Sequence, residues 1–177
     1  MYSKINLFIE MQKWIFRLAL FLVIILYSCG NDRLKVDVSN IEFPQVRINR
    51  LEKDIFSMDP QAISRYSPEM LKKYGNFYNN FIYNVINHGE TPDSVFRAVS
   101  AFIKDPDIKD VYSEVVKKFP DTEIDKISME LTQAFKYFKW HFPTEKTPFH
   151  YATYVSGFEY NFLPVDSTLG IGLDMYL

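Results

Sequence analysis

The hydrophobic pattern divides the chain into a first alternating segment, a middle with helical periodicity and a last alternating stretch. Apolar and polar residues alternate over residues 45 to 51, which predicts a strand. Apolar residues then recur at three- and four-residue spacing, with start and stop signals between the groups. We expect four helices: one from Ser67-Pro68-Glu69 to Gly89, one from Thr91-Pro92-Asp93, one between Asp105-Pro106 and Phe119-Pro120, and one over residues 122 to 141.

Alternation returns after a proline-bounded loop at residues 143 to 148. It covers residues 149 to 156 and again residues 168 to 177, with Gly157 turning the chain after the first of these segments. A strand followed by helices and then by strands favours an α+β fold with a small, mainly antiparallel sheet. The last segment is apolar and has no turn or polar tail, so we expect a domain truncated at its C-terminus.

The N-terminus carries a different pattern, an uninterrupted apolar run over residues 18 to 27. A positive start, an apolar centre and a small residue before the cut are the parts of a secretory signal peptide. The run is shorter than the roughly 20 residues that a membrane-spanning helix needs. The start is positive because it holds Lys4, Lys13 and Arg17 against Glu10.

The small residue is Ser28, and the only cysteine of the chain, Cys29, follows it directly. This arrangement is typical of bacterial lipoproteins, in which that cysteine receives acyl chains such as palmitate and anchors the protein. We expect a signal peptide at residues 1–28, lipidation at Cys29, a polar tether at residues 29–43 and one domain at residues 44–177. An uncleaved signal anchor with an incidental cysteine is the alternative. Both readings place the domain in the cell envelope outside the cytoplasm, and both leave open the inner or the outer membrane.

Charge excludes one class of partner. The first 28 residues hold three of the 20 Lys and Arg residues and one of the 22 acidic residues, which leaves 17 against 21 and a net charge of −4. Nucleic-acid binding needs clustered cations that neutralise phosphates. We therefore expect no nucleic-acid partner, and the aromatic content of 17% indicates a substantial core.

Three histidines are the first candidates for chemistry, because histidine titrates near neutral pH and binds metals. They are His88, His141 and His150. None has a partner at metal-site spacing, and His88 suits the carbonyl end of a helix. The chain also contains no H-E-x-x-H, no P-loop and no G-x-S-x-G motif. We therefore assign no catalytic, metal or cofactor-binding residue.

Carboxylates of the last strands are a second candidate, because paired carboxylates hydrolyse glycosides. They are Glu159, Asp166 and Asp174, and the sequence places no two of them at a defined separation. Asp166 belongs to a segment typical of an ordinary turn. Gly170 and Gly172 lack the third glycine of a nucleotide turn and indicate a bulge or a close strand contact.

The run of aromatic and asparagine residues from 75 to 84 has two interpretations. Its rings either offer stacking faces to a glycan or a partner helix, or they pack into the core. The second interpretation is favoured.

Several strings of residues carry a resemblance to a known family. They are Arg50-Leu51-Glu52-Lys53-Asp54-Ile55-Phe56, the segment DPDIKDVYSEVVKKFPD from Asp105, Phe135-Lys136-Tyr137-Phe138, the loop from Phe142 to Pro148 and the final Leu173-Asp174-Met175-Tyr176-Leu177. In the order and spacing of these strings, more than in any one of them, the chain resembles the gliding-motility lipoprotein GldB family of the Bacteroidetes. The resemblance covers almost the whole region after the signal peptide.

The resemblance implies an envelope lipoprotein that supports the gliding apparatus, with protein partners in that apparatus. It implies no established reaction and no cofactor. Family members continue past the point that matches Leu177, which agrees with a truncated chain. Their second half is distantly similar to zinc metallopeptidase-like folds, but this chain supplies no ligands.

Two main functions stay open from the sequence. The first is a noncatalytic, membrane-tethered component of the gliding machinery. The alternative is an envelope hydrolase whose active site lies beyond residue 177. A third possibility is solute or glycan binding by exposed rings.

Overall fold

The computed structural model describes residues 13–14, 17–18, 36–88, 91, 94–148 and 150–177. The chain divides into two units, Met1–Val38 and Ser39–Leu177. In the first unit the described residues 13–14 and 17–18 are helical. The predicted cleavage site and Cys29 lie outside the described residues. No helix within the described ranges is both long and apolar enough to cross a membrane.

The second unit, called the folded unit below, is built on a four-stranded mixed sheet. Its strands are β1 (Ile48–Arg50), β2 (His150–Tyr154), β3 (Phe162–Val165) and β4 (Thr168–Gly172), in the spatial order β1-β2-β4-β3. β1 pairs with β2 and β2 pairs with β4, both in parallel, whereas β3 and β4 are antiparallel. The α+β class is confirmed, but the expectation of a mainly antiparallel sheet is wrong. Parallel pairing arises because the helical region separates β1 from β2 and returns the chain to the same edge of the sheet.

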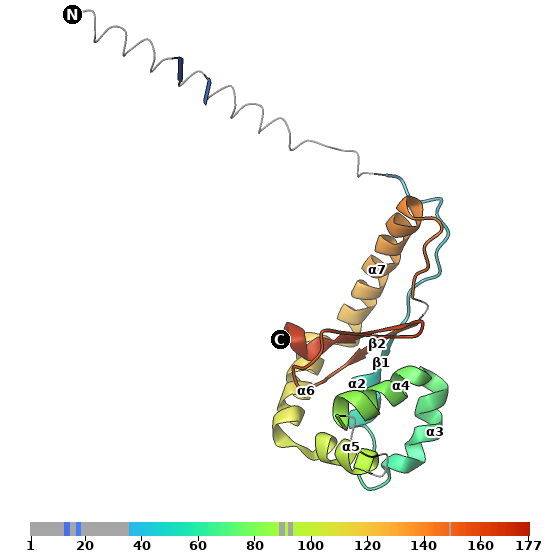
Figure 1. Ribbon diagram of the computed structural model, residues 1–177, viewed down its shortest axis with the longest axis vertical. Coiled ribbons are helices and arrows are strands. Elements are labelled where there is room, and N and C mark those ends of the chain that lie inside the picture. Colours follow the sequence, from blue (N-terminus) through green and yellow to red (C-terminus); the bar gives the residue numbers. More distant parts are fainter. Residues whose placement is uncertain (1–12, 15–16, 19–35, 89–90, 92–93, 149) are drawn as a thin grey trace, which may run out of the picture. The chain divides into compact units, whose positions relative to one another are not determined.

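The helices cover both faces of this sheet (Figure 1). In Figure 1, α2 to α5 lie below the sheet, and α7 rises on its other side. The elements are α2 (Leu51–Phe56), α3 (Ile63–Tyr74), α4 (Asn76–Asn80), the π-helical η2 (Phe81–Ile86), α5 (Val95–Lys104), α6 (Pro106–Lys118), α7 (Asp121–His141) and the terminal 3₁₀ helix η4 (Leu173–Tyr176).

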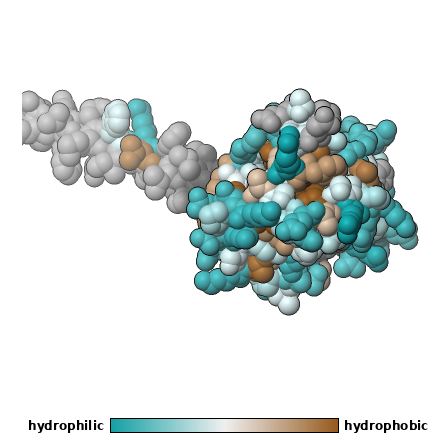
Figure 2. All heavy atoms as spheres, turned by 90° about the horizontal axis from the view of Figure 1, so that it is seen from below, coloured by the Kyte–Doolittle hydropathy of each residue, from teal (hydrophilic) through white to brown (hydrophobic). Residues whose placement is uncertain are grey.

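Two hydrophobic cores result, one on each face. The larger core packs α2 to α5 and η2 against Ala152 and Tyr154 of β2. The smaller core joins Val115 of α6 and Ile124 of α7 to Val155, directly after β2. Residues 151 to 156 are all buried, as expected for a strand covered on both sides. On the outer face drawn in Figure 2, hydrophilic residues surround a smaller area of hydrophobic ones.

The start signal of α6 is confirmed in detail. The Asp105 carboxylate accepts hydrogen bonds from the backbone N–H groups of Asp107, at 2.9 Å, and Ile108, at 3.1 Å. Pro106 occupies the first turn, where its missing N–H costs nothing. The boundary predicted at Asp105-Pro106 is therefore the start of this helix, and the structure shows that Asp105 caps it.

Other helix boundaries differ from expectation. The first long helix begins at Ile63, so Ser67 and Pro68 lie inside it rather than at its start. It is interrupted at Gly75, whose φ of 58° is readily adopted only by glycine, before α4 and η2 continue. The short α2 follows β1 without a loop and was not predicted. Among the described residues of the folded unit, the expected four helices are therefore six, besides the π-helical and 3₁₀ segments.

The expected final strand is also shorter than the sequence suggested. β4 ends at Gly172, and Leu173–Tyr176 forms a 3₁₀ helix. The apolar alternation of residues 173 to 175 misled the prediction, because Leu173 packs into the smaller core while Asp174 is buried as well.

Candidate functional site

Charged residues gather where the parallel strands β1, β2 and β4 end. Arg50 is the last residue of β1, Glu52 lies in the first turn of α2, and Thr153 stands opposite Arg50 in the register with β2. Asp174 follows the end of β4. Because the carboxyl ends of parallel strands form the usual ligand-binding edge of such sheets, this edge is the first place to look for chemistry.

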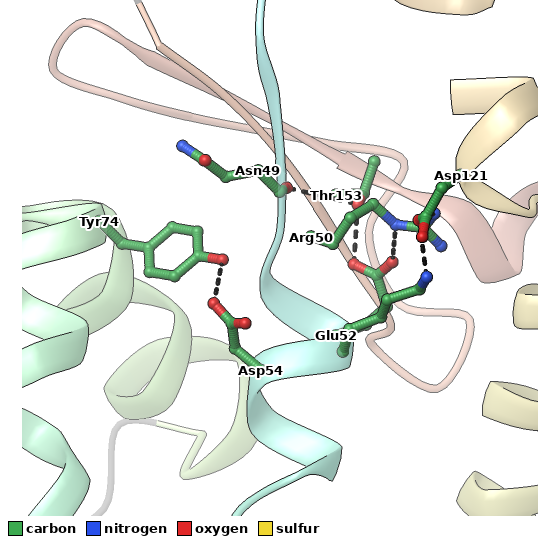
Figure 3. A network of polar contacts seen from close by, with 8 residues as sticks. Asn49, Arg50, Glu52, Asp54, Tyr74, Asp121 and Thr153 are labelled. Carbon is green, nitrogen blue, oxygen red and sulfur yellow. Dashed lines mark hydrogen bonds and ion pairs between the residues drawn. The ribbon is translucent and has the colours of Figure 1, made fainter. Parts of the chain in front are cut away.

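Glu52 is the centre of this edge, shown in Figure 3. Its side chain is wholly buried, and its carboxylate accepts hydrogen bonds from Arg50 Nε and, at 2.7 Å, from Thr153 Oγ1. Both oxygens of the carboxylate therefore have partners. The charge of Glu52 is therefore compensated by Arg50, and its hydrogen bonds fix the orientation of the carboxylate. Through these bonds Glu52 joins α2 to β1 and β2.

The network continues to α7 through its first residue. Arg50 Nη1 donates to Asp121 Oδ1 at 3.0 Å, and Lys53 Nζ lies 2.6 Å from the same oxygen. The hydrogen bond from Lys53, with the charges of Lys53 and Arg50, lowers the pKa of Asp121. Asp121 is largely exposed, so this end of the network is weak compared with the buried pair.

A second polar group lies on the other side of α2. The Asp54 carboxylate accepts hydrogen bonds from Tyr74 Oη at 2.6 Å and from Lys73 Nζ at 2.5 Å. Burial, followed by the hydrogen bond to Asp54, raises the pKa of Tyr74. Tyr74 is therefore held in its neutral form and fixes α3 to α2.

Asp174 is the second buried carboxylate. Its Oδ2 atom accepts hydrogen bonds from the backbone N–H groups of Ser156, at 3.0 Å, and Phe158, at 2.7 Å, and from Ser156 Oγ at 3.2 Å. Ser156 Oγ in turn accepts hydrogen bonds from the N–H groups of Glu159 and Tyr160. Asp174 thus fixes the turn after β2.

The three carboxylates that were candidates for a hydrolytic pair, Glu159, Asp166 and Asp174, bind different partners. Asp166 lies in the turn between β3 and β4 with a φ of 50° and accepts a hydrogen bond from Asn76. Glu159 lies 3.8 Å from His88 Nδ1. Each of these carboxylates, including Asp174, therefore has a local partner of its own, and the turn interpretation of Asp166 is confirmed.

The three histidines are likewise separate. His88 is exposed beyond η2, His141 ends α7 against the ring of Trp140, and His150 begins β2. Within the described part of the chain, no three His, Cys, Asp or Glu side chains form a group that is able to hold a metal ion.

The aromatic run and the two glycines serve packing. Phe77, Tyr78 and Phe81 are almost completely buried. A Cβ atom at Gly170 would lie 2.5 Å from the ring of Phe77, and one at Gly172 would lie 2.1 Å from the carbonyl oxygen of Tyr160. The predictions of core packing and of close strand contact are both confirmed.

Two surface hollows flank the amino ends of β1 and β2. The larger one measures about 610 Å³ and lies between the C-terminal half of α7 and the extended stretches that lead into the two strands. Its lining includes Phe43, Arg47, Lys139, Lys146 and Tyr151. The smaller one, about 320 Å³, is polar and includes Lys72, Asn76 and Asp166. His150 lines both hollows.

Sequence reasoning missed the network around Glu52. The charged string of residues 50 to 54 was noticed only as part of a family resemblance. Nothing in its spacing shows that Glu52 is buried, because its partner Thr153 lies 101 residues later. The signal that could have indicated this network is the predicted strand over residues 45 to 51, which is followed at once by the charged residues 52 to 54.

Comparison with known protein families shows the family to which the chain belongs. The family described as "Gliding motility protein GldB" matches residues 31–177. The chain belongs to this GldB family. No curated protein and no solved structure matches the chain.

The extent of the GldB match agrees with the structural division. It begins after Cys29 and includes the whole folded unit, Ser39–Leu177. The Glu52 network, the Asp174 turn and both hollows are therefore features of the region that defines membership of the GldB family.

Proposed function

We propose that this chain is an envelope lipoprotein that supports the gliding machinery as a noncatalytic, membrane-anchored component. The observation that carries the proposal is the match to the GldB family over residues 31–177. The proposal assigns residues 1–28 to a signal peptide, acylation to Cys29 and a tethering role to residues 29–43, and it places the domain outside the cytoplasm.

The geometry supports a structural role for the buried carboxylates. Glu52 and Asp174 are both at most 2% exposed, and the Glu52 carboxylate and the Oδ2 atom of Asp174 accept hydrogen bonds that join separate parts of the fold. Side chains held by such bonds rigidify a domain. A rigid domain on a lipid tether suits a component that contacts other proteins of a surface machine.

Gene replacement in the native cells tests this proposal. Deletion should abolish gliding, the wild-type chain should restore it, and Cys29→Ala should fail to restore it although the protein is made. The intact mass of the membrane-extracted protein should equal the chain from Cys29 onward plus acyl chains.

Three results would contradict the proposal. Normal gliding of the deletion strain would exclude the role in motility. An unacylated protein that retains residues 1–28 would exclude the lipoprotein. Metal-dependent hydrolysis of peptides or peptidoglycan by the purified protein would exclude the noncatalytic assignment.

A further inference from the structure

The C-terminal end of α7 exposes two large aromatic side chains, one on its last turn and one directly after it. Trp140 is 47% exposed and Phe142 is 52% exposed. Trp140 contacts the ring of His141, and Phe142 contacts Phe138, with ring centroids 5.1 Å apart. These contacts hold the rings in place while leaving about half of each at the surface.

Four cations lie along the C-terminal half of α7 and the larger hollow beside it. Arg47, Lys139 and Lys146 are exposed and line the larger hollow, and Lys136 lies one turn before Trp140 on α7. Among the residues that the structure describes, none of these four cations lies within ion-pair distance of a carboxylate. We call Arg47, Lys136, Lys139, Trp140, Phe142 and Lys146 the α7 tip.

The charge of the α7 tip is opposite to that of the chain that carries it. Two acids lie near its four cations: Glu145 lines the larger hollow, and Glu42 lines a further shallow hollow together with Lys136. The chain as a whole has a formal charge of −2. A local positive surface on an acidic protein indicates a negatively charged partner.

The α7 tip is also where the chain enters the folded unit. The ring of Phe43 stacks on Phe135 of α7 at 5.3 Å, and Thr132 and Ser128 of α7 hydrogen-bond the backbone of Val46. These contacts fix the first residues of the folded unit along the middle and the C-terminal half of α7. Whatever anchors the N-terminal side of the chain is therefore connected first to this end of the unit.

The length of the segment between Cys29 and Ser39 limits the distance between the lipid anchor and the folded unit. Ser39 lies ten residues after Cys29, and a fully extended chain spans about 3.3 to 3.6 Å per residue. The tether therefore reaches at most about 36 Å, and a flexible chain of this length has a typical span of about half that value. The start of the folded unit, which packs along α7, therefore lies within about 36 Å of a membrane that holds Cys29.

We propose that the α7 tip lies on the bilayer that anchors the chain, with Trp140 and Phe142 at the level of the headgroups and the four cations against anionic lipid phosphates. Partly exposed aromatic rings, such as that of tryptophan, prefer the interface between the membrane and water. The aliphatic parts of lysine and arginine side chains contact the apolar side of this interface while their charged groups stay in water. Cations near an anionic leaflet add an attraction that depends on salt. This inference rests on the proposed lipid anchor, and it adds a fixed orientation of the domain to it.

Trp140 provides the direct measurement. The chain has two tryptophans, Trp14 and Trp140, and removal of residues 1–28 leaves Trp140 alone. The acylated protein, verified by its intact mass, is reconstituted into vesicles of phosphatidylcholine with or without phosphatidylglycerol. Lipids brominated near the headgroup should quench Trp140 fluorescence, and aqueous iodide should quench it several-fold less than after enzymatic release of the domain from its anchor.

Matched variants separate the α7 tip from the rest of the surface. Lys139→Glu with Lys146→Glu should reduce quenching by brominated lipids several-fold in anionic vesicles. In the control, Trp140→Phe with Phe96→Trp moves the only tryptophan to α5, at the far end of the folded unit from the α7 tip (Figure 1). The tryptophan of this control variant should stay accessible to iodide.

The outcomes that would overturn the inference are distinguishable. Acylated protein whose Trp140 remains as accessible to iodide as the tryptophan of the control variant would refute the membrane contact but leave the anchor intact. Equal quenching of the two positions by brominated lipids would refute a preferred orientation of the domain. Protein without acyl chains would contradict the anchor itself, and with it the inference.

Discussion

Replacement of Glu52 tests whether the buried ion pair holds the two faces of the fold together. Glu52→Ala removes the carboxylate that accepts hydrogen bonds from Arg50 and Thr153. The Arg50 side chain, only 11% exposed, then keeps its charge but loses its buried partner. The remaining partner is Asp121, whose side chain is 69% exposed.

The expected loss follows from this burial. Breaking a buried ion pair by removing one partner costs about 3 to 5 kcal/mol, against a total stability of roughly 5 to 15 kcal/mol for a domain. Asp121→Ala removes only an exposed partner and should cost about 1 kcal/mol or less. Arg50→Met combined with Glu52→Leu removes both charges, so it should be less destabilising than Glu52→Ala.

Urea unfolding of the chain without residues 1–29, followed by circular dichroism, measures these differences. The four proteins should rank as wild type, Asp121→Ala, the double variant and Glu52→Ala, from most to least stable. If Glu52→Ala does not fold, Glu52→Gln keeps the shape of the side chain and should show an intermediate loss. Equal losses for Glu52→Ala and Asp121→Ala would refute the reasoning, as would a double variant that is less stable than Glu52→Ala.

Three further outcomes are expected. Burial raises the pKa of Tyr74, and it raises the pKa of Tyr151 to about 12. The folded state then holds these protons more tightly than the unfolded chain, so the free energy of unfolding should be unaffected well below about pH 10 and should fall as the pH rises above that value. Urea midpoints between neutral pH and about pH 11 check this, and a flat profile would contradict it. Gly170→Ala places a Cβ atom 2.5 Å from the ring of Phe77 and should cost about 1 to 3 kcal/mol in the same assay. Asp174→Asn weakens the charge-assisted hydrogen bonds to the turn after β2, so it should cost about 1 to 3 kcal/mol and speed limited proteolysis at residues 156 to 160. Unchanged cleavage there would show that Asp174 does not fix the turn.

Local signals predicted the parts of this fold that depend on nearby residues. The Asp105-Pro106 cap identified the start of α6, and the proline-bounded loop after α7 was correctly placed. The start of α3 was missed because Ser67 and Pro68 resemble a start signal but lie in the interior of the helix. The local signal at Ser67 and Pro68 was misleading, because the helix already begins at Ile63, one turn earlier.

Long-range features were outside the reach of the sequence. The parallel direction of β1 and β2 depends on a pairing between Ile48 and Tyr151, and no periodicity reports the direction of a partner strand. The same separation hid the Glu52 network. The α7 tip was not recognised either, because Arg47 and Lys146 come together with Lys139 only when the two extended stretches run beside α7.

The pairing of β1 with β2 also limits when the sheet can close during folding. A chain emerges N-terminus first, so β1 is available early, but its hydrogen-bonding partner is made only after all of α2 to α7. Helices form from local contacts in about a microsecond, whereas contacts between residues this far apart make folding slow. The first strand therefore has no partner until most of the chain has been made, and we expect closure of the sheet to be the slow step that completes the folded unit.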